Sequence, residues 1–293
     1  MQILNLLRAA AHEAGDFSRF QQSTAEVVVK KGSEHDIATS ADLDAGSAIE
    51  ELLRLGLPQY SVVTEENRSG LPPEEFRTRR QEILNNGTAI VVDDLDASFV
   101  YKSSVTISGK KYGGENYGHI IGLVQNRAVT HCVMYLPLAQ VLIAAKAGEG
   151  CFVNGDRHRI PAGKTAANSL FYLVRHQDIP ASFDEMMSHI IYGLKPGGYV
   201  CLNSNIGGLA RVALGEFGAF VGAGKIWDYT GLLAVQEAGG FIASADGQPF
   251  NWSRIPQVVI AAANQEIGEA ILAITKQYPS YQQHFWDNPK FQS

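Results

Sequence analysis

Residues 91–98 read VVDDLDAS and carry an apolar run directly into a cluster of acids. Three carboxylates, Asp93, Asp94 and Asp96, follow the buried strand that we expect at residues 89–92. Like charges this close repel each other wherever water is partly excluded, and a bound cation offsets that repulsion best. Because carboxylate oxygens are hard ligands, the cluster predicts a Mg²⁺ or Mn²⁺ site.

Acids at three other places could belong to the same site, although each also has an ordinary structural explanation. Asp42 lies three residues after Thr39 and can close a capping box at the start of a helix. Glu65 and Glu66 end a strand expected at residues 60–64, where such acids are usually solvated. Asp228 opens a helical stretch, where an acid can act as the N-cap in a favourable position of the helix dipole.

The composition is that of an ordinary globular protein with a large core. The chain has 293 residues, 45% of them hydrophobic and 18% charged, and its formal net charge is −6. That charge argues against attraction of the whole surface to a nucleic-acid polymer or to anionic lipid. No run approaches the ~18 consecutive apolar residues of a membrane span.

The cysteines indicate the redox compartment. Cys132, Cys151 and Cys201 lie far apart, are odd in number and show no metal-ligand spacing. We therefore expect them to be reduced and buried, in a cytoplasmic protein. The N-terminal stretch has helical periodicity interrupted by charges and lacks the unbroken apolar run of a signal segment.

The pattern along the chain divides it into two halves. Residues 1–163 contain a helix capped near Thr39, an antiparallel meander at residues 117–147 and a hairpin at residues 147–159. In residues 164–293 helices and strands alternate: helices at 182–194, 206–214, 228–238 and 265–277, and strands at 198–202, 218–221, 240–243 and 257–262. An antiparallel half joined to an α/β half predicts a layered α/β sandwich, and we expect the two halves to form one continuous catalytic unit.

Five stretches, in this order and spacing, resemble motifs of the inositol monophosphatase family. They are KKGSEHDIATSAD (30–42), TEEN (64–67), VVDDLDAS (91–98), GEGCFVNG (148–155) and IWDYTGLLAVQEAGG (226–240). The resemblance extends over residues 31–264. It implies an αβαβα layered sandwich and a phosphoric monoester hydrolase, and a homodimer is the expected assembly.

The resemblance also implies how the acids are used. The implied metal ligands, which would hold two or three Mg²⁺ with Mn²⁺ as an alternative, are Glu65, Asp93, Asp96, Asp228 and the carbonyl of Leu95. The implied catalytic residues are Asp42, Ser98, Glu65, Asp93 and Asp96. Among them, the Ser98 hydroxyl, linked to Asp42, would accept the proton of the attacking water.

Substrate contacts follow from the same resemblance. The backbone N–H groups around Ala97 and Ser98 would hold a phosphate oxygen at the start of a helix. The full set of expected substrate-binding residues is Asp96, Ala97, Ser98, Ser204, Asn205, Lys225 and Asp228.

Two residues depart from the family's metal-binding motif. Asp94 stands where the family has Pro, and Ala97 stands where it has Gly, which would tolerate a positive φ. Asp94 could be an additional outer carboxylate or a solvated loop acid, and we favour the solvated acid. Trp227 is expected to pack under the metal-binding loop.

The region that would select the substrate departs further from the family. Members that cleave inositol phosphates usually carry a Glu several residues before the Trp-Asp pair, whereas no acid lies between Glu216 and Asp228 here. Lys225 stands nearby and can add a cation. The insert at residues 103–119 is either a surface hairpin or a lid in which Lys102, Lys110 and Lys111 grip an anionic group.

These observations favour an Mg²⁺-dependent phosphatase whose partner is a small phosphorylated metabolite. An inositol phosphate, a sugar phosphate and a nucleotide 3′-phosphate are all possible substrates. The alternatives are a 3′(2′),5′-bisphosphate nucleotidase or a sugar bisphosphatase and, in a different class, a degenerate homologue that binds a ligand or a partner without catalysis. Four intact carboxylates speak against the degenerate homologue.

Overall fold

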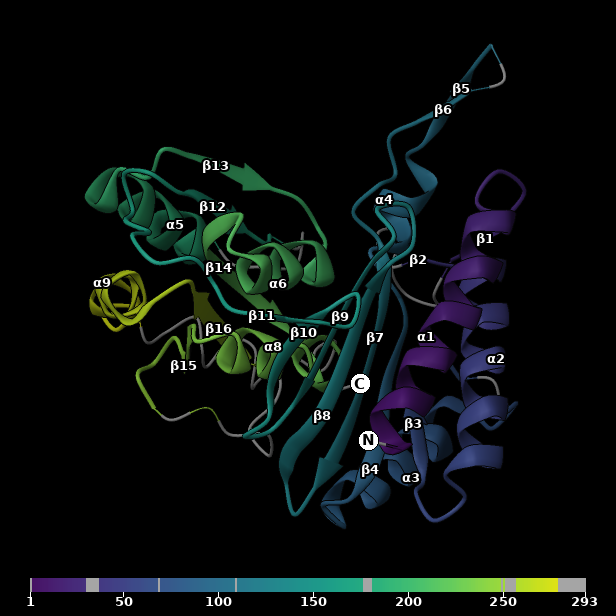
Figure 1. Ribbon diagram of the computed structural model, residues 1–293. Coiled ribbons are helices and arrows are strands. Elements are labelled where there is room, and N and C mark those ends of the chain that lie inside the picture. The colour runs from purple at the N-terminus through teal and green to yellow at the C-terminus, as the bar shows by residue number, and fades with distance from the viewer. Residues whose placement is uncertain are drawn as a thin grey trace.

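A computed structural model describes residues 2–29, 37–67, 69–108, 110–175, 181–248, 250 and 257–278. Its main body consists of two β-sheets and three groups of helices (Figure 1). No helix among the described residues combines the length and apolarity that crossing a bilayer requires. Residues 30–36, which begin the first family-like motif, lie outside the described part of the chain.

The larger sheet has seven strands and contains the acidic stretch. Its spatial order is β11-β10-β9-β8-β7-β4-β3, and only the β3–β4 pair is parallel. The strands are β3 (Val62–Thr64), β4 (Ala89–Asp96), β7 (Gly118–Gln125), β8 (Ala128–Leu136), β9 (Val141–Lys146), β10 (Gly150–Val153) and β11 (Asp156–His158). The predicted meander and the Asn154-Gly155 hairpin are confirmed.

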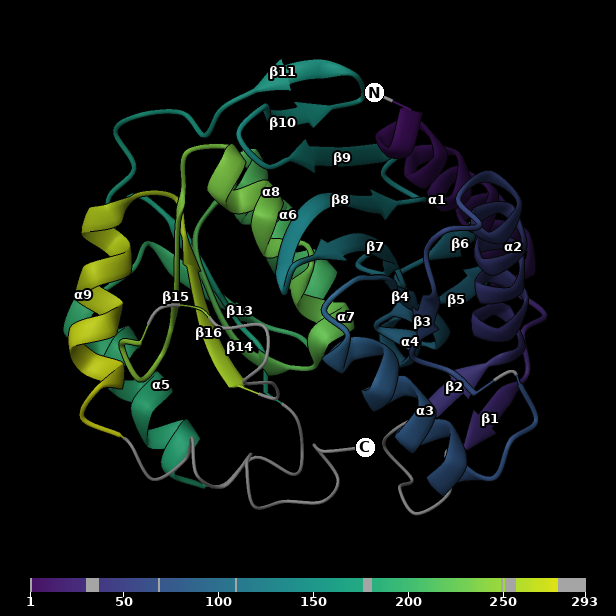
Figure 2. The same cartoon turned by 90° about the horizontal axis from the view of Figure 1, so that it is seen from below.

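Helices α1 (Gln2–Gln21) and α2 (Ser40–Gly56) cover the outer face of this sheet (Figure 2). Helix α2 begins after the extended residue Thr39, and the apolar residues Ile49 and Leu53 lie on its buried face. A short two-stranded sheet of β1 (Val27–Val29) and β2 (Ile37–Thr39) leads into α2, while α3 (Pro73–Asn85) connects β3 to β4. The first turn of α2 lies beside the residues that follow β4, because the Ser98 hydroxyl donates a hydrogen bond to Asp42 Oδ1 at 2.6 Å.

The smaller sheet has five strands in the order β13-β12-β14-β16-β15. These are β12 (Leu170–Leu173), β13 (Gly198–Cys201), β14 (Phe217–Gly224), β15 (Phe241–Ser244) and β16 (Gln257–Ala262). Helices α5 (Ala181–Leu194) and α9 (Gln265–Thr275) pack on its outer face. Helices α6 (Asn205–Leu214) and α8 (Leu232–Glu237) lie in the largest hydrophobic cluster, between the two sheets. The order helix, sheet, helix, sheet, helix confirms the predicted αβαβα sandwich.

Four local predictions need correction. Strand β12 lies in a stretch to which the sequence pattern assigned no strand, and β4 continues through Asp96 instead of ending at Val92. The single helix expected at 228–238 is two short helices, α7 (Ile226–Tyr229) and α8. Cys132 and Cys151 are buried as expected, but Cys201 is exposed at the edge strand β13.

The insert at residues 103–119 forms a hairpin of β5 (Val105–Ile107) and β6 (Lys110–Tyr112). It follows the short helix α4 (Ser98–Lys102) and projects beyond the main body (Figure 1). The Lys102 ammonium does not extend along this hairpin, because it donates a hydrogen bond to the Ala25 carbonyl at 2.5 Å. The backbone thus has the form of the surface hairpin.

Ala97 connects β4 to α4 in a left-handed conformation, with φ 70° and ψ 45°. An L-residue with a Cβ pays about 1–2 kcal/mol in this region, because the Cβ approaches a backbone carbonyl. Ala97 therefore keeps the backbone turn for which the family's Gly is suited, at a cost in stability.

We expect Ala97→Gly to raise the free energy of unfolding by about 1 kcal/mol, because the relief of the left-handed strain exceeds the entropy that glycine adds to the unfolded chain. Urea denaturation measures the change. The matched control is Ala273→Gly at an exposed helical position of α9, which should lose about 1 kcal/mol. Equal destabilisation of both variants would contradict strain at Ala97.

Candidate metal centre and active site

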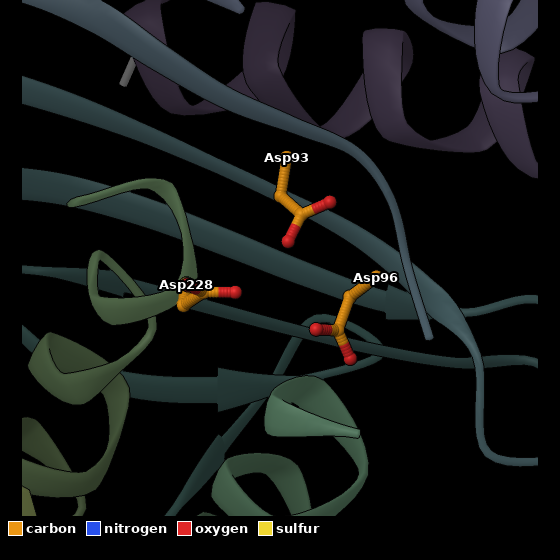
Figure 3. Close-up of side chains that lie close together, drawn as sticks. All are labelled: Asp93, Asp96 and Asp228. Carbon is orange, nitrogen blue, oxygen red and sulfur yellow. The ribbon is translucent and has the colours of Figure 1, made fainter. Parts of the chain in front are cut away.

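Three buried aspartates converge where α7 lies against β4 (Figure 3). Strand β4 supplies Asp93 and Asp96, and α7 supplies Asp228. One carboxylate oxygen from each lies within 4.8 Å of the others. Residues more than 130 positions apart in the chain thus form one ligand set, because α7 packs against β4.

Burial makes the negative charges of this cluster costly. It raises the pKa of Asp96 to about 8, with the neighbouring Asp228 as a further cause, and that of Asp228 to about 6. Burial, followed by the charge of Glu65, holds the pKa of Asp93 well above its usual range. Among the described residues, Asp93 Oδ1 has no hydrogen-bond partner. A divalent cation would offset the repulsion and supply that missing partner, so the donor set fits Mg²⁺.

The first turn of α6 holds Asp96 in place. The Asp96 carboxylate accepts hydrogen bonds from the N–H groups of Ile206 at 2.9 Å and Asn205 at 3.3 Å, and from Ser204 Oγ at 3.1 Å. Ser204 also caps α6 by accepting from the Gly207 N–H at 2.9 Å. Ser204 and Asn205, which were predicted to bind substrate, therefore contact the metal-site carboxylates.

Asp228 is held from two sides. Asn205 Nδ2 donates to its Oδ1 at 2.9 Å, and the Lys225 backbone N–H donates to its Oδ2. The structure corrects the simple N-cap interpretation of Asp228, because Lys225 is the N-cap residue of α7 and Asp228 is the third residue of the helix.

Glu65 and Leu95 lie at the edges of this cluster. Glu65 directly follows β3, where its N–H donates to the Val92 carbonyl at 3.1 Å, and after burial its charge is the largest cause of the raised pKa of Asp228. The Leu95 carbonyl accepts a hydrogen bond from Ser98 Oγ at 3.1 Å. A carbonyl oxygen has two lone pairs, so this bond leaves one free for a cation.

Asp42 combines the two roles that the sequence left open. Its Oδ2 accepts the Thr39 N–H at 2.7 Å, which is one of the bonds of a capping box. Its Oδ1 accepts the Ser98 hydroxyl at 2.6 Å. Because a carboxylate has two oxygens, one can fix the start of α2 while the other orients Ser98.

The preference for Asp94 as a solvated loop acid is wrong. Asp94 is only 1% exposed, and its Oδ2 accepts the Glu66 N–H at 3.1 Å. His119 Nδ1 bonds the Asp94 carbonyl, and burial lowers the pKa of His119 to about 4, so the ring is neutral at pH 7. Sequence reasoning missed His119, because a lone histidine in an apolar strand gives no local signal.

Trp227 is 4% exposed and lies beside the site, in line with its expected packing role. Two cations lie over its ring: Lys225 Nζ is 5.2 Å from the ring centroid, and the guanidinium carbon of Arg80 is 4.6 Å from it. Arg80 belongs to α3, a helix without fully buried residues, whose sequence pattern gives no signal for this contact.

Comparison with known proteins finds relatives in sequence and solved structures with a similar fold. Inositol monophosphatase 1 of Sus scrofa is 22% identical over 89% of each chain. The structure of the extragenic suppressor protein SuhB from Bartonella henselae has a TM-score of 0.77 at 22% identity and covers 95% of this chain and 100% of its own. The structure of an IMPase/NADP phosphatase complexed with Mg²⁺ and phosphate has a TM-score of 0.74 at 17% identity, covering 96% and 97% of the two chains.

The profile of the inositol monophosphatase family matches residues 2–280, which is nearly the whole chain. The protein belongs to the inositol monophosphatase family, a family of phosphomonoesterases.

Proposed function

We propose that this protein hydrolyses a small phosphomonoester with Mg²⁺ bound at the aspartate cluster. The observation that carries the proposal is the group of three buried carboxylates within 4.8 Å of one another. Their charges need a counter-ion, and the Ser98–Asp42 pair beside them provides a hydroxyl for proton handling. A similar fold crystallised with Mg²⁺ and phosphate supports the choice of ion and ligand.

We assign the metal ligands to Glu65, Asp93, Asp96, Asp228 and the carbonyl of Leu95, with two or three Mg²⁺ at the site and Mn²⁺ as a substitute. When bound, the ions supply neutralisation of the phosphate oxygens and activation of water. Asp93 and Asp96 present their carboxylates from β4, while Glu65 and Asp228 approach from β3 and α7.

Ser98 and Asp42 move the proton. The Ser98 hydroxyl accepts a proton from the attacking water as it passes its own to Asp42 Oδ1, with which it is already hydrogen-bonded at 2.6 Å. The Thr39 N–H bond to the other oxygen keeps the Asp42 carboxylate in orientation. Asp42 is 2% exposed, so bulk water is excluded from this step.

The substrate would lie against Asp96, Ala97, Ser98, Ser204, Asn205, Lys225 and Asp228. None of the residues of β14 is acidic, and Val221, near the position of the family's inositol-contacting Glu, packs in the cluster under α5 and α9. Strand β14 therefore offers no carboxylate to a ring hydroxyl of the substrate, whereas Lys225 offers a cation next to Asp228. The second candidate function is consequently a bisphosphate nucleotidase or a sugar bisphosphatase.

Two other expectations stay predictions: assembly as a homodimer and location in the cytoplasm. We also propose that residues 1–163 and 164–293 act as one catalytic unit. The hydrogen bonds from the start of α6 to Asp96 of β4 support this proposal.

Mg²⁺ should stabilise the fold through the aspartate cluster. At a free Mg²⁺ concentration of 100 Kd, linkage predicts about 2.7 kcal/mol of added stability. Thermal melts in EDTA and in Mg²⁺ measure the effect, and Asp96→Asn should lose most of it. The control Asp184→Asn, on the distant helix α5, should keep the full Mg²⁺ response. Superimposable wild-type melts at saturating Mg²⁺ would refute the site.

Ser98→Ala should lower kcat by roughly 10²–10⁴-fold, because it removes a proton acceptor from the reacting water. KM should change far less, and Ser98→Thr should keep activity because it retains the hydroxyl. Steady-state kinetics test this, with Ser103→Ala as the control, since the Ser103 hydroxyl donates to the Val100 carbonyl of α4 at 2.7 Å. An unaltered kcat in Ser98→Ala would remove Ser98 from the mechanism.

The substrate ranking should favour a compound with a second anionic group over myo-inositol 1-phosphate. A pocket without an acceptor for a substrate hydroxyl no longer favours the substrate that carries this hydroxyl. The loss of such a hydrogen bond can change kcat/KM by roughly 10⁴-fold. The measurement is kcat/KM for inositol 1-phosphate, adenosine 3′,5′-bisphosphate, a sugar bisphosphate and histidinol phosphate. If inositol 1-phosphate ranks first, or if Lys225→Met leaves the ranking unchanged, the substrate argument fails while the phosphatase assignment stands.

A further inference from the structure

Arg80 joins two segments that carry metal-site carboxylates. It lies on α3, in the connection between the Glu65 end of β3 and the start of β4. Its guanidinium carbon is 4.6 Å from the centroid of the Trp227 ring and 5.2 Å from that of Phe76. Its Nη1 contacts the Glu65 carbonyl oxygen at 3.5 Å. The side chain therefore reaches the backbone of one expected ligand and the residue next to another.

Trp227 links Arg80 to Asp228, because Trp227 and Asp228 are neighbours in α7. The indole is buried and directly precedes Asp228 in the four-residue helix α7. Helices this short have few internal hydrogen bonds, so packing of their side chains fixes their orientation. A planar guanidinium stacked on an indole is a favourable packing contact, worth more when it is shielded from water.

The positive charge of Arg80 also lies close to the acids. Burial lowers the pKa of Arg80 from its ordinary value, while the charges of Glu65 and Glu66 act in the opposite direction and raise it. A fixed cation beside a metal site repels Mg²⁺. Charge alone would thus make Arg80 weaken metal binding, whereas positioning of the ligands would make it strengthen metal binding.

We propose that Arg80 is a positioning residue of the metal centre, which holds Glu65 and the Trp227–Asp228 turn at the separation that binds Mg²⁺. This inference rests on the proposed function. The contacts support positioning over charge compensation, because Arg80 bonds the backbone carbonyl of Glu65 and its guanidinium lies over two aromatic rings. Removing it should then weaken Mg²⁺ binding, which is opposite in sign to the effect of removing a repelling charge.

The test is the Mg²⁺ dissociation constant of metal-stripped full-length protein, measured by isothermal titration calorimetry. Arg80→Gln should raise Kd by about 10-fold or more, the effect usual for loss of a residue that orients metal ligands. Arg80→Lys should have an intermediate Kd, because it keeps a cation over the ring and loses the planar guanidinium with its several donors. Tryptophan fluorescence should change in Arg80→Gln and stay unchanged in the control variant Arg79→Gln.

Arg79→Gln is the matched control. It removes the same charge from the neighbouring, exposed position of α3, and its Kd should stay within about twofold of wild type, as expected for a solvated surface charge. Arg80 lines a cavity of about 450 Å³ between α2, β3 and α3, so a different side chain at this position can adjust without displacing its neighbours. Circular dichroism checks folding, and if Arg80→Gln does not fold, Arg80→Lys decides.

An unchanged or lower Kd in Arg80→Gln, or in Arg80→Lys where the Gln variant is unfolded, overturns the positioning role. The phosphatase proposal is unaffected by that result. Wild-type protein that binds no Mg²⁺ overturns both proposals. Wild-type protein that binds Mg²⁺ without phosphatase activity overturns only the proposed function, and the order of the Kd values still decides the role of Arg80.

Discussion

The repulsion among three buried carboxylates is the constraint on which the rest of the structure depends. Asp93, Asp96 and Asp228 gain nothing from hydrophobic burial, and burial raises the pKa of each. The chain keeps them together by aiming donors at them: the first N–H groups of α6, the Asn205 amide and the Lys225 N–H. A bound divalent cation would compensate the remaining repulsion.

Those donors explain why the site needs the whole sandwich. Asp96 belongs to the seven-stranded sheet, whereas the α6 donors belong to the helical layer packed between the sheets. Asp228 reaches the cluster only where the turn after β14 lies against β4. The carboxylates and their donors therefore lie close together only in the folded sandwich, with the large core between the sheets in place. The geometry of the candidate metal site depends on the whole fold for this reason.

The sequence was sufficient for the features that are encoded locally. The meander, the Asn154-Gly155 hairpin and the capping of α2 follow from periodicity and turn residues, and the structure has all three. The order of the family-like motifs predicted the αβαβα sandwich and the carboxylates that converge in it. Strand β12 was not predictable in the same way, because its burial is decided by β13 and β14 on either side.

Tertiary contacts decided the features that the sequence could not show. Arg80 lies in an α3 that has no fully buried residue, so its pattern is that of a solvated helix. The Arg80 guanidinium lies next to the candidate site only because Trp227, nearly 150 residues later in the chain, packs beneath it. Asp94 is similar, since an acid in a loop is solvated by default unless another segment offers it a donor.

The contacts of Asp94 explain how the acidic stretch at residues 93–96 keeps its shape without the family's Pro. Proline would restrict φ within the stretch itself. Here the restraint comes from outside: the Asp94 carboxylate accepts the Glu66 N–H, and the Asp94 carbonyl accepts His119 Nδ1–H from β7. The bond to Glu66 also ties the stretch to the segment that carries Glu65. The substitution therefore exchanges a local restraint for one that couples two acidic segments of the candidate site, and the αL conformation of Ala97 persists within that tethered stretch.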